Sequence, residues 1–559
     1  MLDALPKSGG QGRLKRVLVL GGYGTFGARI CELLVRHPDF SVLVAGRSLE
    51  KATEYCGRHP DPRLTPVRVD RDHSLQEKLE EIRPWLVVDA AGPFQGATYK
   101  VAKGCIAAGC NYLDIADGRD FVEEFSFLDG DAKAAGVTLI SGASSVPSLS
   151  SAVVTQLSAG LDRLGLVESA ITASNRATVG RSVLEAILSY VGRPVALRQG
   201  GQTLQAHGWR DLRRMTFATS RSRPLIGRWV GICDVPDLGV MSDQLPGRPL
   251  VLFRAGAELA LHNLSLWLFG WVVQWGLLRS LLPLAGALQL LRGLTSRLGG
   301  ERSAMLVSVV GQSGGDTVER RWTLIADHGR GPYTPCLAAP LLAKRLADGQ
   351  LPHGAYTAAG LLPLEAFEPD FAGLGFDTET VEVRSSAPLY ARILGDAFDR
   401  LPFAIRELHH PAGALLAEGR ARVTRGTSLA ARVIALMMRF PPAALDVPVR
   451  VRFFEWGGPE TWIRTFGSSS FTSKLSERDG LLIERFGPLQ FGFALNGDAS
   501  GLSMDFRRWW LGPLPMPRAL GPRTKARETV SDGIFHFDVA ISMPMVGPII
   551  RYEGSLAVK

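Results

Sequence analysis

Cysteine is scarce in this sequence, with six residues among 559. So few thiols in so long a chain do not make a disulfide framework, and no two of them have the spacing of zinc ligands with a histidine nearby. We therefore expect no metal site, and a chain that works in a reducing, cytoplasmic setting.

A hydrophobic signal sequence is also lacking, because the first residues, MLDALPKSGGQGRLKR, contain no apolar core. We predict that residues 1–13 form a short disordered leader. Internal repeats and low-complexity tracts are absent from the sequence, and its length allows two to four domains.

Long hydrophobic runs are limited to one segment, residues 255–292. Its most apolar part, residues 264–278, falls short of the roughly 20 residues that a helix needs to cross a bilayer, and Arg279 and Pro283 interrupt its continuation. Three interpretations stay open: helices buried in the core or in a homodimer interface, an interfacial hairpin that makes peripheral membrane contact through residues 264–291, and a membrane span. Three tryptophans of this segment share one helical face. They are Trp267, Trp271 and Trp275.

Basic residues exceed acidic ones, with a formal net charge of +9, but they are scattered along the chain. A modest cluster at residues 518–527 is interpreted as a solvated loop. We expect no nucleic-acid partner. A basic balance of this size is compatible with an anionic small molecule or a membrane surface.

The stretch VLVLGGYGTFGARICELL, residues 17–34, is the most informative part of the chain. An apolar run, a Gly-x-Gly-x-x-Gly spacing and a helical pattern follow one another, which is the order of a strand, a turn and a helix N-terminus that cradles a pyrophosphate. Gly22 is expected to allow the turn, Gly24 to let the backbone approach the phosphates, and Gly27 to let helix and strand pack closely. Tyr23, Thr25 and Phe26 complete this predicted cofactor loop.

The wider pattern predicts an α/β protein in three parts. Residues 14–147 alternate strands and helices, which indicates a doubly wound Rossmann domain with a parallel sheet. Residues 148–386 are expected to form an α+β substrate or dimerisation domain. Residues 387–559 carry period-two alternation, which indicates a β-rich domain built as an antiparallel, half-exposed sheet or an open barrel.

The end of the second predicted strand favours NADP over NAD. NAD-selective folds place a carboxylate there for the ribose 2′-hydroxyl, whereas this chain has Arg47, which can pair with a 2′-phosphate, and Ser48, which can donate a hydrogen bond to it. Asp70 ends the third strand and either accepts from the adenine amino group or caps the next turn.

The segment AAGPFQG, residues 90–96, ends the fourth strand. Its small residues would let the backbone lie against the nicotinamide side of the cofactor, at the carboxyl edge where ligands of such sheets bind; the alternative is a plain turn with no ligand contact. The residues assigned to this contact are Ala91, Gly92, Pro93 and Phe94.

The motifs GGYGTFG, AGRS, AAGPFQG, GCIAAGCNYLDIADG and SGASSVPS, taken in this order, resemble the saccharopine dehydrogenase-like NADP-binding oxidoreductase family over roughly residues 14–383. The tail, residues 388–559, resembles an uncharacterised domain family found behind such reductases. The resemblance implies a nicotinamide-dependent oxidoreductase in which Gly22, Gly24, Gly27, Arg47 and the turn at residues 92–94 carry the cofactor. Many members have a glutamate after the glycine that corresponds to Gly118, and this chain lacks it.

Candidate catalytic residues lie where the fifth strand ends. They are Tyr112, Asp114, Asp117 and Arg119, each of which could instead serve a helix cap or a structural salt bridge. His207, His262 and His328 are further candidates for proton supply.

Three functions are compatible with this sequence. The first is an NADPH-dependent reductase of a small apolar or lipid-like substrate. The second is a non-catalytic NADP-binding sensor or scaffold, and the third is a lipid-binding protein with a vestigial nucleotide fold.

Overall fold

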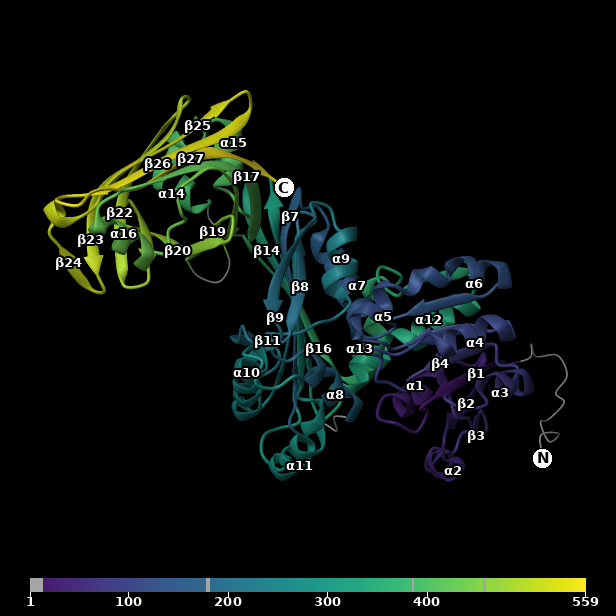
Figure 1. Cartoon of the computed structure of the whole chain (residues 1–559). Helices are drawn as coiled ribbons and strands as arrows, with labels where there is room; N and C mark the ends of the chain where they lie inside the picture. Colours follow the sequence, from purple (N-terminus) through teal and green to yellow (C-terminus); the bar gives the residue numbers. More distant parts are fainter. Residues whose placement is uncertain (1–13, 177–180, 385–386, 456–458) are drawn as a thin grey trace.

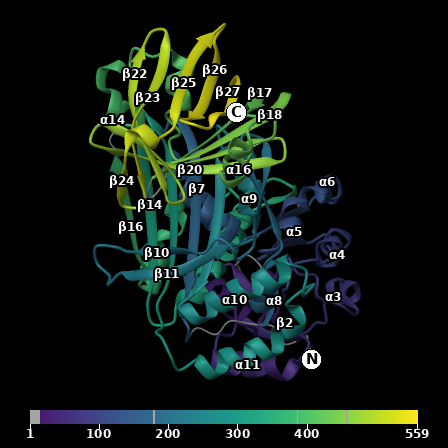
Figure 2. The same cartoon turned by 60° about the vertical axis from the view of Figure 1, so that its left-hand side comes forward.

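Three β-sheets follow one another along the molecule, with the second sheet between the other two (Figure 1; Figure 2). The computed structural model describes residues 14–176, 181–384, 387–455 and 459–559. The predicted leader, residues 1–13, lies outside these ranges.

The first sheet is parallel, in the order β15-β6-β5-β4-β1-β2-β3. Its central strands carry nearly continuous apolar runs because helices cover both faces, and Val17, Val44 and Val88 are fully buried. This is the predicted doubly wound Rossmann architecture, which is confirmed. The strands are β1 (Lys15–Leu20), β2 (Phe40–Gly46), β3 (Leu64–Arg68), β4 (Leu86–Asp89), β5 (Asn111–Asp114), β6 (Thr138–Ser141) and β15 (Gly354–Thr357), and the helices are α1 (Gly27–Leu34), α2 (Leu49–Arg58), α3 (Leu75–Ile82), α4 (Lys100–Ala108), α5 (Arg119–Glu123) and α6 (Asp129–Ala135).

The seventh strand of this sheet comes from much later in the chain. β15 pairs in parallel with β6, and the preceding helix α12 (Ala338–Ala347) contacts α1 and β5. Both elements fall within residues 148–386, the range that the sequence assigned to the middle domain. Helix α12 therefore packs on the first sheet and its helices.

The second sheet is mixed, in the order β10-β11-β12-β7-β13-β14-β16. Its central strand β7 runs parallel to β12 and antiparallel to β13. It forms one hydrophobic core with the first sheet. The strands are β7 (Arg163–Ala173), β10 (Arg213–Phe217), β11 (Leu225–Ile232), β12 (Leu250–Ala257), β13 (Ser303–Ser313), β14 (Asp316–Ala326) and β16 (Asp377–Arg384), with the separate hairpin β8 (Pro194–Gln199) and β9 (Gln202–His207) and the helices α7 (Ser150–Ser158), α8 (Arg181–Tyr190), α9 (Asp237–Gln244), α10 (Ala260–Gln274), α11 (Ala285–Thr295) and α13 (Glu368–Leu374).

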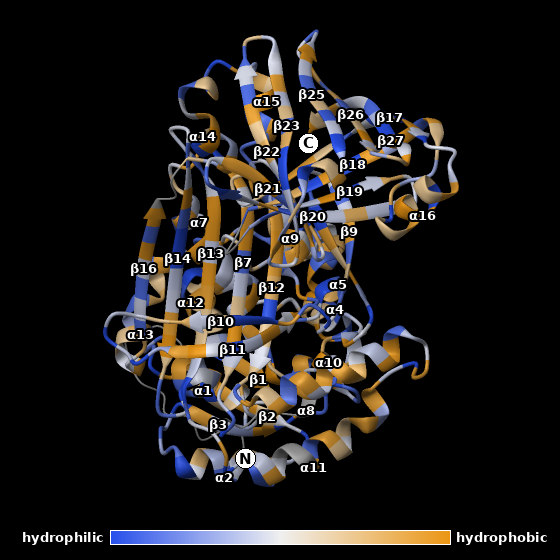
Figure 3. Cartoon of the chain, turned by 90° about the vertical axis from the view of Figure 1, so that its left-hand side faces the viewer, coloured by the Kyte–Doolittle hydropathy of each residue, from blue (hydrophilic) through white to orange (hydrophobic). Residues whose placement is uncertain are grey.

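The apolar segment forms helices α10 and α11, which are buried on one side only. Trp267 packs against the core and its indole N–H donates to the Arg210 carbonyl at 3.2 Å, while the Arg210 guanidinium lies 3.1 Å from the centre of the Trp271 ring. The opposite side carries exposed leucines, and Figure 3 shows the apolar colouring of α10. Among the described residues, no helix combines the length and apolarity needed to cross a membrane.

The third sheet is antiparallel and closes on itself. Its order is β22-β21-β20-β19-β18-β17-β27-β26-β25-β23, and the added pairing of β22 with β23 completes the ring. It has a hydrophobic core of its own. The strands are β17 (Ala414–Arg425), β18 (Ala444–Phe454), β19 (Glu460–Phe466), β20 (Ser469–Arg478), β21 (Leu481–Phe486), β22 (Leu489–Asp498), β23 (Gly501–Leu511), β24 (Leu514–Met516), β25 (Arg523–Ser531), β26 (Ile534–Met543) and β27 (Gly547–Val558), and the helices are α14 (Leu389–Leu394), α15 (Phe403–Leu408) and α16 (Leu429–Met437).

His410 joins the closed sheet to the second sheet. Its ring nitrogens contact Gln312 Nε2 at 2.6 Å and Thr317 Oγ1 at 3.1 Å, and its carbonyl accepts from Arg163 at 2.9 Å. Burial beside Arg163 lowers the pKa of His410 to about 4, so the imidazole is neutral around pH 7. A neutral ring can accept at one nitrogen and donate at the other, which fits the amide and hydroxyl that it meets.

Candidate functional site

The glycine loop between β1 and α1 is shaped by close backbone contacts. A Cβ at Gly27 would lie 2.1 Å from the Gly21 carbonyl oxygen, so only glycine allows this helix to start so near the strand. The left-handed residue is Gly21, with φ at +74°, and not Gly22. The predicted turn role of Gly22 is therefore corrected: its missing side chain serves packing, since a Cβ there would lie 2.9 Å from the Val19 carbonyl oxygen.

The loop and the helix start present backbone to the carboxyl edge of the sheet. No side chain caps the α1 N-terminus, and the first turn has no acidic residue. Such a terminus attracts an anion through its N–H groups and the positive end of the helix dipole. Tyr23 lies beside this loop and its hydroxyl accepts from the Ser48 N–H at 3.0 Å, which ties the loop to the end of β2.

Arg47 and Ser48 follow β2 and differ in the contacts that they already make within the chain. Ser48 caps α2, because its Oγ accepts from the Lys51 N–H at 3.2 Å, and its own hydroxyl proton is still available to donate. Arg47 is exposed. The prediction that Arg47 and Ser48 meet a 2′-phosphate therefore stays a prediction.

Two interpretations of Asp70 were open, an adenine contact and a turn cap, and in the structure it forms the turn cap. Its carboxylate accepts from the Asp72 N–H at 3.0 Å and contacts His73 Nδ1 at 3.3 Å. The hydrogen bond from Asp72 holds the pKa of Asp70 below its ordinary value.

The turn after β4 is held by an ion pair that the sequence analysis missed. Buried Asp89 accepts from the Ala91 N–H at 3.0 Å and meets the Arg71 guanidinium at 3.4 Å, and Arg71 also donates to the Ala91 carbonyl. This fixes the backbone of the predicted nicotinamide-side turn. A carboxylate that ends a buried strand was the only sequence signal, and it did not identify Arg71 as the partner.

A cavity of about 290 Å³ opens where the carboxyl edge of the first sheet meets the ends of the strands in the second. From the first sheet it is lined by the glycine loop and by the turns after β4, β5 and β6, and from the second by β7, β12, β13 and β14. Helix α8 and the start of the segment before α12 complete the wall. Lining residues include Phe26, Gly92, Pro93, Phe94, Ile115, Asp117, Ser144, Val146, Ile171, Thr172, Tyr190, Cys233, Phe253, Met305, Leu324 and Thr334.

Of the four catalytic candidates, Asp117 alone lines this cavity. Gln95 Nε2 donates to its carboxylate at 3.0 Å, and burial raises the pKa of Asp117. Of the described residues that line the cavity, Asp117 is the only one with a carboxylate side chain.

The other three candidates lie outside the lining of this cavity. Asp114 Oδ1 accepts from the Ala116 and Gly142 N–H groups and from Ser141 Oγ, all within 3.0 Å. Arg119 pairs with Glu123 at 2.6 Å and Asp234 at 3.2 Å. Tyr112 lies on β5, is buried and stacks on Phe125, and it does not line this cavity. His207, His262 and His328 also lie outside the lining.

Two cavity residues were missed because they come from the second sheet and its helices. Tyr190 ends α8 and Cys233 follows β11, and both lie against the cavity. Burial raises the pKa of the Tyr190 hydroxyl, and it raises that of the Cys233 thiol to about 12, so both carry their protons at neutral pH. Nothing in their positions relative to the glycine motif indicates that they lie near a bound nucleotide.

The comparisons identify two of the three parts. Residues 17–140 match the model of the saccharopine dehydrogenase NADP binding domain, and residues 401–556 match the domain of unknown function DUF4166. The predicted fusion of these two domains is confirmed, and the first match supports a nicotinamide cofactor. No curated protein matches the chain.

Solved dehydrogenase structures resemble the chain weakly. GenD2 from gentamicin A biosynthesis, in complex with NAD, is 15% identical with a TM-score of 0.32, over 68% of this chain and 99% of that one. A probable dehydrogenase from Thermotoga maritima is 9% identical with a TM-score of 0.34, over 66% and 98%. At such scores the likeness carries no argument about substrate or cofactor.

The residues present fit a nicotinamide dinucleotide. The glycine loop has no room for a Cβ at Gly22 or Gly27, and the cavity lies beside it at the same sheet edge. Thr172 Oγ1, buried in the cavity wall, has no hydrogen-bond partner within the described ranges, so a polar group of a ligand can meet it.

Proposed function

We propose that this protein is an NADP(H)-dependent oxidoreductase that reduces an apolar, lipid-like substrate in the 290 Å³ cavity. The observation that carries the proposal is the composition of that cavity. One carboxylate and a few hydroxyls lie among Phe, Ile, Met, Leu and Val side chains, directly beside the glycine loop. A site for a charged amino-acid substrate needs more cations than this wall offers.

Each residue has a limited task in such a reaction, because a nicotinamide supplies the hydride. Phe26, Phe94 and Met305 exclude water from the cavity. The Tyr190 hydroxyl is placed to donate a hydrogen bond to an acceptor oxygen. Asp117, whose raised pKa favours the protonated form, exchanges the proton that accompanies hydride transfer, while Gln95 fixes the orientation of its carboxyl group.

Selectivity for NADP(H) rests on Arg47. Arg47 directly follows β2, is exposed, and makes no described ion pair, while no carboxylate occupies the position that NAD-selective folds use. A 2′-phosphate at this place would gain a charge-assisted contact.

The α10–α11 face is proposed to contact an anionic membrane surface. Leu261, Leu268, Leu290 and Leu294 are each at least 59% exposed there. Between residues 259 and 300 the sequence has three arginines and no acidic residue. Apolar side chains flanked by cations are suited to the headgroup region of a bilayer that contains anionic lipid, from which an apolar substrate would come.

NADPH consumption tests the proposed activity. Purified full-length chain is incubated with NADPH and with long-chain aldehydes, ketones or enoyl compounds, and absorbance at about 340 nm, the nicotinamide band of a reduced cofactor, is followed. Asp117→Asn is expected to lower kcat by about 100-fold, because proton transfer by a positioned side chain contributes that much. The Kd for NADPH should stay unchanged.

The matched control is Asp120→Asn, an exposed acid in the first turn of α5. It should leave kcat near the wild-type value. Protein that binds NADPH and reduces none of the compounds would favour the sensor or scaffold function. Equal losses in the two variants would remove the role given to Asp117.

A further inference from the structure

The closed sheet encloses a second and larger cavity, of about 820 Å³. A closed sheet of eight strands has an interior that side chains can fill or that can hold one small ligand. The ring here contains more than eight strands. Inward-facing positions alternate along each strand: Phe535, Phe537, Val539 and Ile541 of β26 line the cavity, as the period-two pattern predicts. The volume lies within the range of small-molecule sites, about 300–1,000 Å³.

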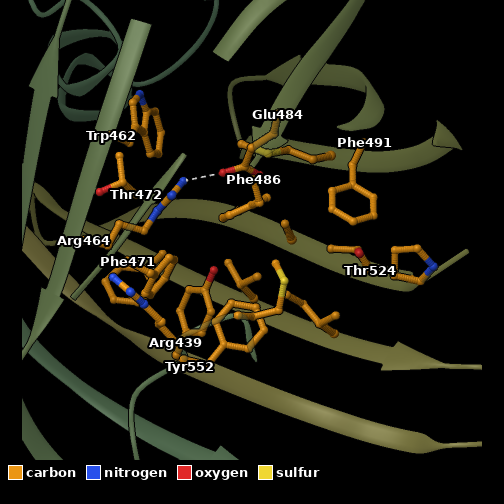
Figure 4. A pocket seen from close by; sticks show the side chains of 18 of the residues that line it. Arg439, Trp462, Arg464, Phe471, Thr472, Glu484, Phe486, Phe491, Thr524 and Tyr552 are labelled. Carbon is orange, nitrogen blue, oxygen red and sulfur yellow. Dashed lines mark hydrogen bonds and ion pairs between the residues drawn. The ribbon is translucent and has the colours of Figure 1, made fainter. Parts of the chain in front are cut away.

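The wall of this cavity is mostly aromatic and aliphatic (Figure 4). Side chains of this kind cannot satisfy a polar ligand, so the occupant must be apolar over most of its length. The aromatic lining comes from several strands. It includes Phe466, Phe471, Phe486, Phe491, Phe493, Phe535, Phe537 and Tyr552.

The charges deep in the cavity are already paired. Arg464 meets Glu484 at 3.0 Å and donates to Ser473 Oγ at 2.8 Å, and Figure 4 shows the guanidinium turned toward Glu484. Glu528 contacts His409 Nε2 at 2.6 Å. Each of these charged groups already has a partner within the chain and does not need one from a ligand.

Arg439 is different. It follows α16, lines the cavity, and is exposed, which places it at the entrance. Among the described residues no side chain forms a hydrogen bond or ion pair with its guanidinium. The same end of the sheet exposes Met437 and Leu436 of α16 and Met545 in the turn after β26, so apolar side chains surround the entrance.

We infer that the closed sheet binds one long-chain amphiphile with a single anionic end, its hydrocarbon chain in the lumen and its anion at Arg439. The apolar lining requires a ligand that is mostly hydrocarbon. The unpaired Arg439 guanidinium requires that the head group of this ligand is negatively charged. An arginine pairs well with a carboxylate or phosphate group, and such contacts are charge-assisted. This site is separate from the cofactor cleft and does not depend on the proposed reductase activity.

Displacement of a fluorescent polyene fatty acid tests this inference. The full-length chain is stripped of lipid and titrated with cis-parinarate, which is then displaced by hexadecanoate or by hexadecanol. One probe molecule should bind per chain. Hexadecanoate should compete about tenfold better than hexadecanol, the effect of a partly solvated charge-assisted contact.

Arg439→Gln should abolish the preference for hexadecanoate and leave the affinity for hexadecanol unchanged. The control is Arg432→Gln, which removes the same charge from an exposed position of α16 outside the cavity. Arg432→Gln should retain the preference. Equal competition by acid and alcohol in the wild type, or equal effects of the two variants, would overturn the role of Arg439.

A lumen variant tests the cavity itself. Val539→Trp fills space at the wall and should lower probe binding at least tenfold, while thermal unfolding and NADPH binding report that the chain is folded. Wild-type protein that shows no saturable, displaceable probe binding would overturn the inference. NADPH titration of the same sample separates the two proposals, since loss of NADPH binding with retained probe binding counts only against the reductase.

Discussion

At the scale of single residues, Asp114 lies outside the lining of the cavity and is held by hydrogen bonds within the fold. It is fully buried at the end of β5, and its Oδ1 gathers three hydrogen bonds that fix the turns after β5 and β6. Oδ2 has no described partner. Burial is the largest effect and raises the pKa of Asp114 to about 7.

The raised pKa of Asp114 makes stability depend on pH. The folded chain binds this proton more tightly than the unfolded chain, so the contribution is fully present below pH 3.8 and is lost as pH rises to about 7. Asp114→Asn keeps the Oδ1 acceptor and cannot ionise. Between pH 4 and pH 8 its free energy of unfolding should fall by about 2–4 kcal/mol less than that of the wild type, since one pKa unit is worth about 1.4 kcal/mol.

Urea unfolding at both pH values measures this difference. Asp120→Asn, which removes an exposed carboxylate nearby, should behave as the wild type does. Parallel pH dependence in the wild type and Asp114→Asn would show that Asp114 is not a buried, proton-binding acid.

The site residues differ in whether their roles depend on local contacts or on contacts with distant parts of the chain. The Gly22, Gly24 and Gly27 spacing predicts the start of α1 because the contacts involved are local. Tyr190 and Cys233 reach the cavity only because the second sheet folds over the first, and no local pattern records that. Arg71 likewise acquires its role from Asp89, which ends β4, a strand that does not neighbour β3 in the sheet.

At the scale of elements, sequence pattern predicted the type of most strands and helices but not all of their neighbours. The alternation of residues 14–147 predicted the parallel sheet, and period-two alternation predicted the inward face of β26. It did not predict β15, because its sequence, GAYT, contains no apolar run and its place is set by pairing with β6. Closure of the third sheet through β22 and β23 is equally non-local.

The α10–α11 face yields a prediction at this scale. Flotation of the full chain with vesicles of phosphatidylcholine and phosphatidylglycerol should recover protein, and Leu268→Glu should reduce the bound fraction about tenfold or more. Burying a leucine side chain contributes about 1.5–3 kcal/mol, and the added anion is repelled by the same lipid.

Phe403→Glu is the control, since Phe403 is 70% exposed on α15, away from this face. It should float like the wild type. Light scattering of the same proteins reports the other occupant of the face: a wild-type dimer that Leu268→Glu converts to monomer, without any flotation, would contradict membrane contact.

At the scale of the whole molecule, two cores define two working parts. The first and second sheets share one core and enclose the cofactor cleft, whereas the closed sheet has a core and a cavity of its own. His410 and Arg163 link the parts through hydrogen bonds, and Ala414 of β17 and Phe454 of β18 also pack against the core of the first two sheets. Cofactor binding and amphiphile binding can therefore be measured separately on one chain.

Titration of the full-length protein with NADPH and NADH, followed by nicotinamide fluorescence, tests whether the glycine loop and the adjoining cavity bind a nicotinamide dinucleotide. We expect saturable NADPH binding with enhanced emission in the apolar cavity. Arg47→Asp should weaken NADPH binding by about 1.5–3 kcal/mol and spare NADH, while Arg58→Asp, at the far end of α2, should change neither. Absence of saturable binding by either dinucleotide would contradict the oxidoreductase assignment, and equal weakening of both by Arg47→Asp would contradict NADP selectivity.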